Sequence, residues 1–132
     1  MVDRLTESAQ YRHNWSTPAA DRILGDDARF AAWLTIVGAL AQAQADNDVI
    51  PREAAQAISG LAVSDCDQEA IARGTRETGH STLGFIRELQ RVLPGHAKEY
   101  VCYGVTVQDI TDTWFGLVMR DRKSTRLNSS HL

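Results

Sequence analysis

The chain has 132 residues, of which 43% are hydrophobic and 23% charged, a composition typical of one small soluble domain rather than a disordered or fibrous chain. Its 17 acidic residues exceed its 14 lysines and arginines, which argues against nucleic acid or an anionic membrane surface as a partner. No apolar stretch is long enough to span a bilayer, and the first residues lack the apolar core of a signal peptide. Two cysteines do not make a disulfide framework, so we expect a reducing, cytoplasmic location.

Helical periodicity dominates the first two thirds of the chain. Thr17 and Pro18 form a helix start, with a hydroxyl cap before a first-turn proline. The clearest helix is expected from Asp26 to about Asn47, and Pro51 is expected at the first position of the next. Ser64 to Asp67 fits the Ser/Thr-x-x-Asp start signature of a helix to about Thr75, and a further helix is predicted over 82–92.

The last third begins with a β-prone run, 101–105, that ends in a glycine-containing loop. Thr106 to Asp109 then repeats the helix-start signature, and Trp114, Leu117 and Val118 mark the apolar stripe of a helix still running at Arg120. The predicted fold class is therefore mostly α.

Residues 121–131 read DRKSTRLNSSH and resemble, residue for residue, the translation of a common sequencing adapter. We interpret residues 121–132 as a non-native tail. Natural sequence is then expected to stop at about Arg120, inside a gene.

The first candidate for chemistry is the Gly79-His80-Ser81 turn between two predicted helices. Backbone amides near a helix N-terminus, together with a histidine, suit a carboxylate or a phosphate. The structural alternative is that Ser81 only caps the helix and that His80 is a surface residue.

The second candidate is the segment 103–109, where a loop containing Gly104 leads into a helix start. Thr106 and Gln108 could donate hydrogen bonds to a bound carboxylate there. The structural alternative is that Thr106 and Asp109 only cap the helix. No metal-ligand spacing and no nucleotide-binding fingerprint is present in the sequence, so we expect no metal and no cofactor.

Three stretches, 26–58, 77–90 and 103–113, resemble the N-terminal region of the aspartase/fumarase superfamily, on the adenylosuccinate lyase and carboxymuconate cycloisomerase side. With their spacing they cover most of residues 14–120. The resemblance implies an N-terminal helical domain over 1–105 and the start of a long central-bundle helix over 106–120. It also implies a homotetramer in the full-length protein.

The activity implied by the resemblance is an anti elimination that releases fumarate from a small dicarboxylate-containing substrate. By resemblance, His80, Ser81, Thr106 and Gln108 would bind the substrate, and Gly104 and Asp109 would shape the loop. The family's general acid histidine and its catalytic serine lie in later segments, so no catalytic residue is assigned here, and the fragment is expected to be inactive.

The sequence departs from the family pattern in ways that leave the substrate open. Cys102 stands where the family has a histidine, Val107 replaces a hydroxyl residue, and Asn14-Trp15 replaces an arginine-tyrosine pair. A non-purine substrate is therefore plausible, and a carboxymuconate cycloisomerase-type enzyme is an alternative. A second alternative is a non-catalytic helical interaction module that uses the 114–118 stripe, unpartnered in so short a chain, as a dimer surface.

Overall fold

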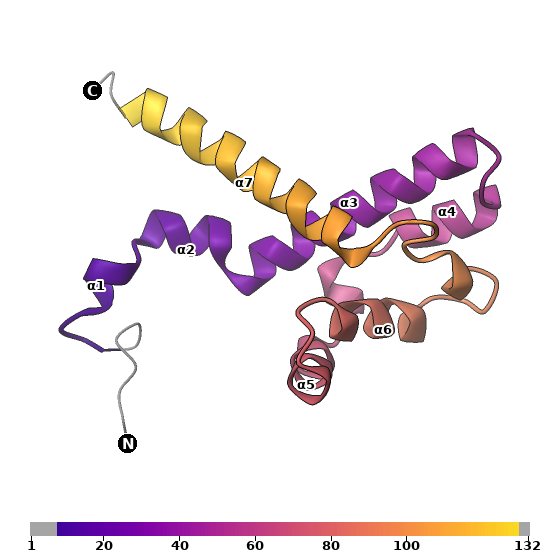
Figure 1. The fold of residues 1–132 in the computed structure, drawn as a ribbon, viewed down its shortest axis with the longest axis horizontal. Coiled ribbons are helices and arrows are strands. Elements are labelled where there is room, and N and C mark those ends of the chain that lie inside the picture. The colour runs from indigo at the N-terminus through magenta and orange to yellow at the C-terminus, as the bar shows by residue number, and fades with distance from the viewer. Residues whose placement is uncertain (1–7, 130–132) are drawn as a thin grey trace.

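A computed structural model describes residues 8–129, apart from the side chains of Trp15 and of residues 121–129. Within this range the chain is helical and contains no strand (Figure 1). The elements are α1 (Arg12–Trp15), α2 (Pro18–Leu24), α3 (Asp26–Asp46), α4 (Arg52–Ser59), η1 (Val63–Asp65), α5 (Gln68–Thr78), α6 (Leu83–Val92), η2 (Lys98–Tyr100) and α7 (Val107–Ser129).

Helix α3 is the longest buried element, and α4 folds back alongside it (Figure 1). The two helices approach closely because Gly38 has no side chain: a Cβ there would lie 3.2 Å from the Ser59 Cα. The predicted bounds of α3 agree with the structure to within one residue. The predicted start at Pro51 is one residue early, because Pro51 occupies the N-cap position of α4 and the helix begins at Arg52.

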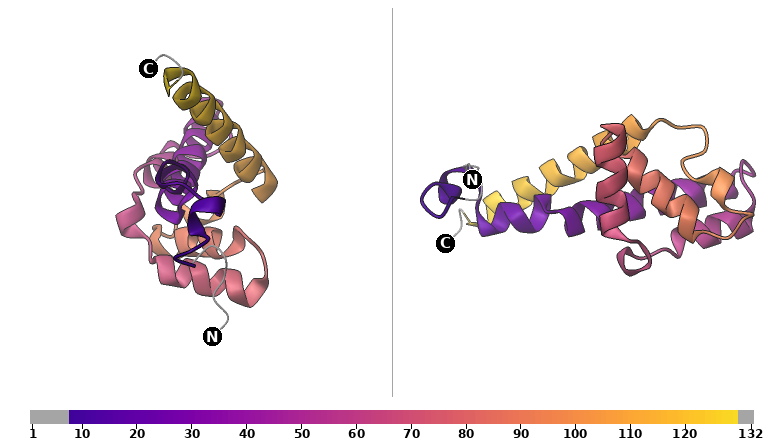
Figure 2. Two further views of the ribbon diagram at one scale, coloured as in Figure 1. Left: turned by 90° about the vertical axis from the view of Figure 1, so that its left-hand side faces the viewer. Right: turned by 90° about the horizontal axis from the view of Figure 1, so that it is seen from below.

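Helices α5 and α6 cross at a pair of glycines. A Cβ on Gly84 would lie 2.4 Å from the Ile71 carbonyl oxygen, and one on Gly74 would lie 2.8 Å from the Gly84 Cα. The backbones therefore touch, and neither position has room for a methyl group. Seen from below, α5 lies across the direction of α3 (Figure 2).

The core is centred on an aromatic cluster that joins three helices. The Trp33 ring of α3 lies 5.3 Å from the Phe85 ring of α6 and 6.4 Å from the Trp114 ring of α7, both in edge-on arrangements. Phe30 stacks on Phe85 at 6.2 Å. Edge-to-face aromatic pairs at such distances add stability beyond their buried area, so Trp33 fixes the N-terminal parts of α6 and α7 against α3.

The predicted helix start at Ser64 is wrong. Ser64 lies in η1, and α5 begins three residues later with Asp67 as its N-cap, where the carboxylate accepts from the Glu69 and Ala70 amides. The physical reason is tertiary: the Asp67 N–H donates to the buried carboxylate of Glu88 on α6, at 2.7 Å. That bond fixes the entry to α5 at this residue.

The β-prone run 101–105 forms successive turns before α7, in keeping with the mostly α fold that was expected. Cys102 and Gly104 have positive φ values of 56° and 70° there, a conformation incompatible with an extended chain. The domain boundary at 105/106 stays a prediction.

The apolar stripe of α7 is partnered rather than open, contrary to the prediction. Val118 is 5% exposed and Trp114 packs on Trp33. Among the α7 side chains that the structure describes, the exposed large apolar ones are Phe115 and Met119, at 58% and 53%. Because Phe115 lies within 114–118, the interaction-module alternative stays a prediction.

Beyond Arg120 the α7 backbone stays helical to Ser129, while residues 130–132 of the predicted tail lie outside the described residues. The non-native origin of the tail stays a prediction. Within the described range no helix combines the length and the hydropathy that crossing a membrane requires.

Candidate functional site

The first turn of α7 is organised by its own side chains. The Thr106 N–H donates to Asp109 Oδ2 at 2.9 Å, and the Gln108 N–H donates to Thr106 Oγ1 at 3.0 Å. This is the reciprocal capping expected from the helix-start signature, and the loop-shaping role of Asp109 stays a prediction. Among the described residues no acceptor is recorded for the Val107 N–H, which lies at the positive end of the helix on a half-buried residue.

The side chain of Gln108 lies on the exposed start of the same helix. Its Nε2 donates to Asp112 Oδ1 at 2.6 Å. An amide nitrogen carries two hydrogens, so this bond orients the group and leaves the second hydrogen for another acceptor. Thr106, Gln108 and Asp109 are all exposed, as residues that meet a ligand from solvent must be.

The turn that leads into α7 is tied to α3 by a residue that the sequence reasoning missed. Gln44 Nε2 donates to the carbonyl oxygen of Tyr103 at 2.6 Å, across 59 residues of sequence. Gln44 stands 11 residues after Trp33, three helical turns along the same face of α3. That spacing, together with the aromatic face it continues, is the only sequence signal that could have singled it out.

The first candidate segment of the sequence analysis, Gly79-His80-Ser81, lies between α5 and α6. Gly79 ends α5 in the left-handed conformation, at φ 65°, as predicted for a chain break. His80 Nδ1 accepts from the Thr82 N–H at 3.3 Å, so a neutral His80 carries its proton on Nε2, which is directed away from that bond. Ser81 does not cap α6, because the N-cap position is occupied by the fully buried Thr82.

The two segments are connected through the core. Phe85 follows His80 by five residues and Trp114 follows Thr106 by eight, and both rings contact Trp33. This shared contact links α6 and α7 to α3, but it does not itself bring His80 and Thr106 together. That His80 and Thr106 line one cleft stays a prediction.

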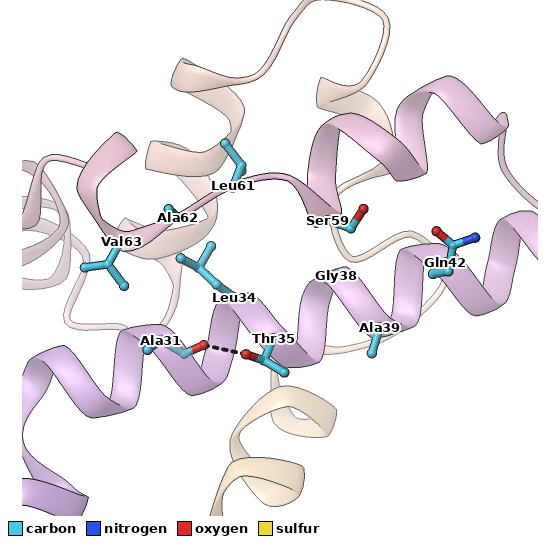
Figure 3. Close-up of a pocket in the computed structure, with 10 residues that line it drawn as sticks. All are labelled: Ala31, Leu34, Thr35, Gly38, Ala39, Gln42, Ser59, Leu61, Ala62 and Val63. Atoms are coloured by element: carbon cyan, nitrogen blue, oxygen red, sulfur yellow. Dashed lines mark hydrogen bonds between the residues drawn. The ribbon is translucent and has the colours of Figure 1, made fainter.

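An open groove of about 460 Å³ lies elsewhere, between α3 and the α4–η1 connection (Figure 3). It is lined by small and apolar residues such as Gly38, Ala39 and Leu61, with Thr35 bonded to the Ala31 carbonyl. Thr35 and Gln42 point away from the face that carries Trp33 and Gln44. The groove carries no titratable residue and is separate from the candidate site.

The electrostatics near the site do not favour a nucleophilic cysteine. Burial raises the pKa of the Cys102 thiol to about 11, so Cys102 is a neutral thiol at physiological pH. In the part of the chain that the structure describes, no three His, Cys, Asp or Glu side chains gather as metal ligands would.

The chain spans between 21% and 31% of the length of five curated relatives that it matches. It is 36% identical over 92% of its length to N-acetyl-S-(2-succino)cysteine lyase of Enterococcus italicus, covering 27% of that protein. It is 31% identical over 83% of its length to adenylosuccinate lyase of Methanocaldococcus jannaschii, covering 24% of it. No protein-family profile matches the chain.

A solved structure shares the fold. The crystal structure of β-carboxy-cis,cis-muconate cycloisomerase from Acinetobacter calcoaceticus matches with a TM-score of 0.75 and 32% identity, over 85% of this chain and 27% of that one. The helical fold of this chain is thus shared with a cycloisomerase, and its curated relatives include several lyases. More particularly, the chain belongs to the aspartase/fumarase superfamily, in the branch that holds adenylosuccinate lyase and carboxymuconate cycloisomerase.

Proposed function

We propose that this chain supplies the dicarboxylate-binding part of a lyase that releases fumarate by anti elimination, of the adenylosuccinate lyase type. The observation that carries the proposal is the similarity over most of the chain to lyases whose names share a succinate unit. In these substrates carbon 2 of succinate carries a nitrogen, the sulfur of cysteine or a nitro group, and both carboxylates are free. A pocket that holds the two carboxylates of this group would serve all three.

The elimination removes a proton and a leaving group from neighbouring carbons and forms one C=C bond. A base removes a proton from the carbon beside one carboxylate, the electron pair forms the C=C bond of fumarate, and the bond from the neighbouring carbon to the leaving group breaks. Negative charge accumulates on the carboxylate oxygens before that bond breaks. Preorganised donors aimed at those oxygens lower the barrier.

The described residues supply donors of this kind. At the start of α7 these are the Val107 amide, the Thr106 hydroxyl and the second hydrogen of Gln108 Nε2. In the α5–α6 segment, His80 Nε2–H and the exposed Ser81 hydroxyl would contact the same substrate. Asp109 and Gly104 hold the first group in shape, through the Thr106 amide and the left-handed turn.

We assign the general acid and base to segments outside this chain, so that residues 1–132 alone would bind but not turn over. The whole enzyme would be a cytoplasmic homotetramer acting without cofactor. A cycloisomerase-type enzyme is the second candidate, favoured by the structural match at a TM-score of 0.75 and by a 31% identical relative, 3-carboxy-cis,cis-muconate cycloisomerase of Pseudomonas putida.

Genomic DNA read past codon 120 is the first test. The proposal expects a Thr-His-Gly segment downstream and then a Gly-Ser-Ser-x-Met-Pro loop, whereas a stop codon soon after codon 120 would contradict it. The complete protein would then be assayed for fumarate release from adenylosuccinate and from S-(2-succino)cysteine, with 3-carboxymuconate as the cycloisomerase substrate. If neither adenylosuccinate nor S-(2-succino)cysteine releases fumarate, the lyase assignment is wrong.

A further inference from the structure

Gln44 has an arrangement of contacts that stability alone does not explain. Its Nε2 makes a short bond to the Tyr103 carbonyl, while its Oε1 is buried and has no hydrogen-bond partner within the described residues. A buried acceptor without a partner is destabilising. An apolar side chain of similar length would fill the same space without leaving that acceptor unpaired.

The carbonyl that Gln44 holds lies at the most constrained point of the turn before α7. Tyr103 stands between Cys102 and Gly104, whose φ values of 56° and 70° are both left-handed. For Cys102 this conformation is unfavourable, because a side chain clashes with its own backbone there. The turn therefore needs an external contact to stay in this shape.

Local bonds alone hold the turn weakly. The Val105 N–H reaches the Cys102 carbonyl at 3.3 Å, and the Tyr103 N–H reaches the Tyr100 carbonyl at the same length. The Tyr103 side chain is 48% exposed and contacts the Tyr100 ring at 5.8 Å. The bond from Gln44 is the shortest of these polar contacts, and it comes from the rigid α3.

We propose that Gln44 is a positioning residue for the ligand-binding turn. By holding the Tyr103 carbonyl it fixes where the backbone amides from Gly104 to Val107 and the Thr106 hydroxyl point. The inference rests on the proposed function of that turn, and it adds a residue from α3 to the site. Gln44 itself does not contact the ligand.

The test compares Gln44→Leu, which removes the donor and keeps the volume, with Gln44→Glu, which keeps the shape but cannot donate when ionised. Gln42→Leu is the matched control, because Gln42 lies on the other side of α3 and bonds only to Asp46 nearby on the same helix. Three properties are measured on the 132-residue chain. They are the urea unfolding midpoint, amide hydrogen exchange at Val105 and Thr106, and succinate binding followed by NMR titration.

For Gln44→Leu we expect an unchanged unfolding midpoint, exchange at Val105 and Thr106 faster by about fivefold, and succinate binding weaker by about fivefold, as loss of one neutral hydrogen bond implies. Gln44→Glu should loosen the turn at neutral pH in the same way, and Gln42→Leu should change none of the three. A purely structural role would instead lower the midpoint and accelerate exchange throughout the chain.

Unchanged exchange at Val105 and Thr106 in both Gln44 variants would overturn the inference, even if succinate binds. Faster exchange only in step with a lowered unfolding midpoint would overturn it as well. If the unaltered chain binds no succinate but the Gln44 variants still loosen the turn, then the tether stands and the proposed carboxylate-binding role of the turn fails. The two failures are thus distinguishable.

Discussion

The buried carboxylate of Glu88 is a single charge that stabilises the contact between α5 and α6. Its side chain is 2% exposed, and its oxygens accept from the Asp67 N–H at 2.7 Å and from the Arg91 guanidinium at 2.8 and 2.7 Å. Glu88→Gln preserves the volume and one acceptor but removes the charge that strengthens these bonds. Since hydrogen bonds to a charged group contribute about 1.5–3 kcal/mol each, we expect a loss of about 2 kcal/mol at pH 7.

For a chain of this size that loss corresponds to a fall in Tm of about 8 °C, measured by circular dichroism. Glu69→Gln is the control, because Glu69 also pairs with an arginine, through one bond of 2.6 Å to Arg76, but with side chains 69% and 64% exposed. An exposed pair contributes little, so this variant should melt close to the unaltered chain. Equal shifts for the two variants would refute the argument from burial.

The Glu88→Gln variant also tests how the contribution of Glu88 to stability depends on pH. The bonds from Arg91 hold the pKa of Glu88 below its ordinary value near 4.5. In the window between the lowered and the ordinary pKa the unfolded chain binds more protons, so stability rises with pH there. The contribution of Glu88 is complete above about pH 5 and is lost as pH falls through the lowered pKa. The Tm difference between Glu88→Gln and the unaltered chain should shrink accordingly, and a difference that stays constant down to about pH 3 would contradict the linkage.

Three further predictions concern other elements. Gly84→Ala should destabilise by about 2 kcal/mol or more in urea unfolding, because its Cβ would meet a carbonyl oxygen at 2.4 Å. Gly116→Ala, with open space around it, should stabilise by about 0.5–1 kcal/mol; equal effects of the two would contradict the close crossing. Asp109→Ala should cost about 1 kcal/mol in the same assay by removing the acceptor of the Thr106 amide, while Asp109→Asn should retain part of it. Cys102, with a pKa raised to about 11, should be alkylated by iodoacetamide at pH 8 about a hundredfold more slowly than a thiol of pKa 9.0; a rate like that of free cysteine would show the thiol to be exposed.

The sequence alone predicted the features that depend on near neighbours. The periodicity of α3 and the capping pattern from Thr106 to Asp109 rest on contacts three or four residues apart, and the structure confirms both. The predicted start of α5 is wrong because Ser64 and Asp67, three residues apart, are both residue types that can act as an N-cap. The choice between them is made by Glu88, 21 residues away.

The remaining errors have the same origin. The apolar sequence pattern of α7 is the same whether or not another helix packs against it. Only the structure shows that the Trp114 ring contacts the Trp33 ring of α3. Local propensity favours an extended chain over 101–105, whereas the segment forms turns in which the Tyr103 carbonyl accepts a bond from Gln44. The capping contacts within the first turn of α7 were thus predictable, whereas the contact between the preceding turn and α3 was not.

The bond between Gln44 and Tyr103 also bears on the order in which the molecule assembles. Closing a loop of 59 residues costs considerable chain entropy and comes after local helices have formed. The turn that would bind the ligand therefore acquires its shape only after α3 and the later part of the chain have come together. A chain that retained succinate would have completed this long-range contact, so ligand retention would report on the tertiary fold and not on the local helices alone.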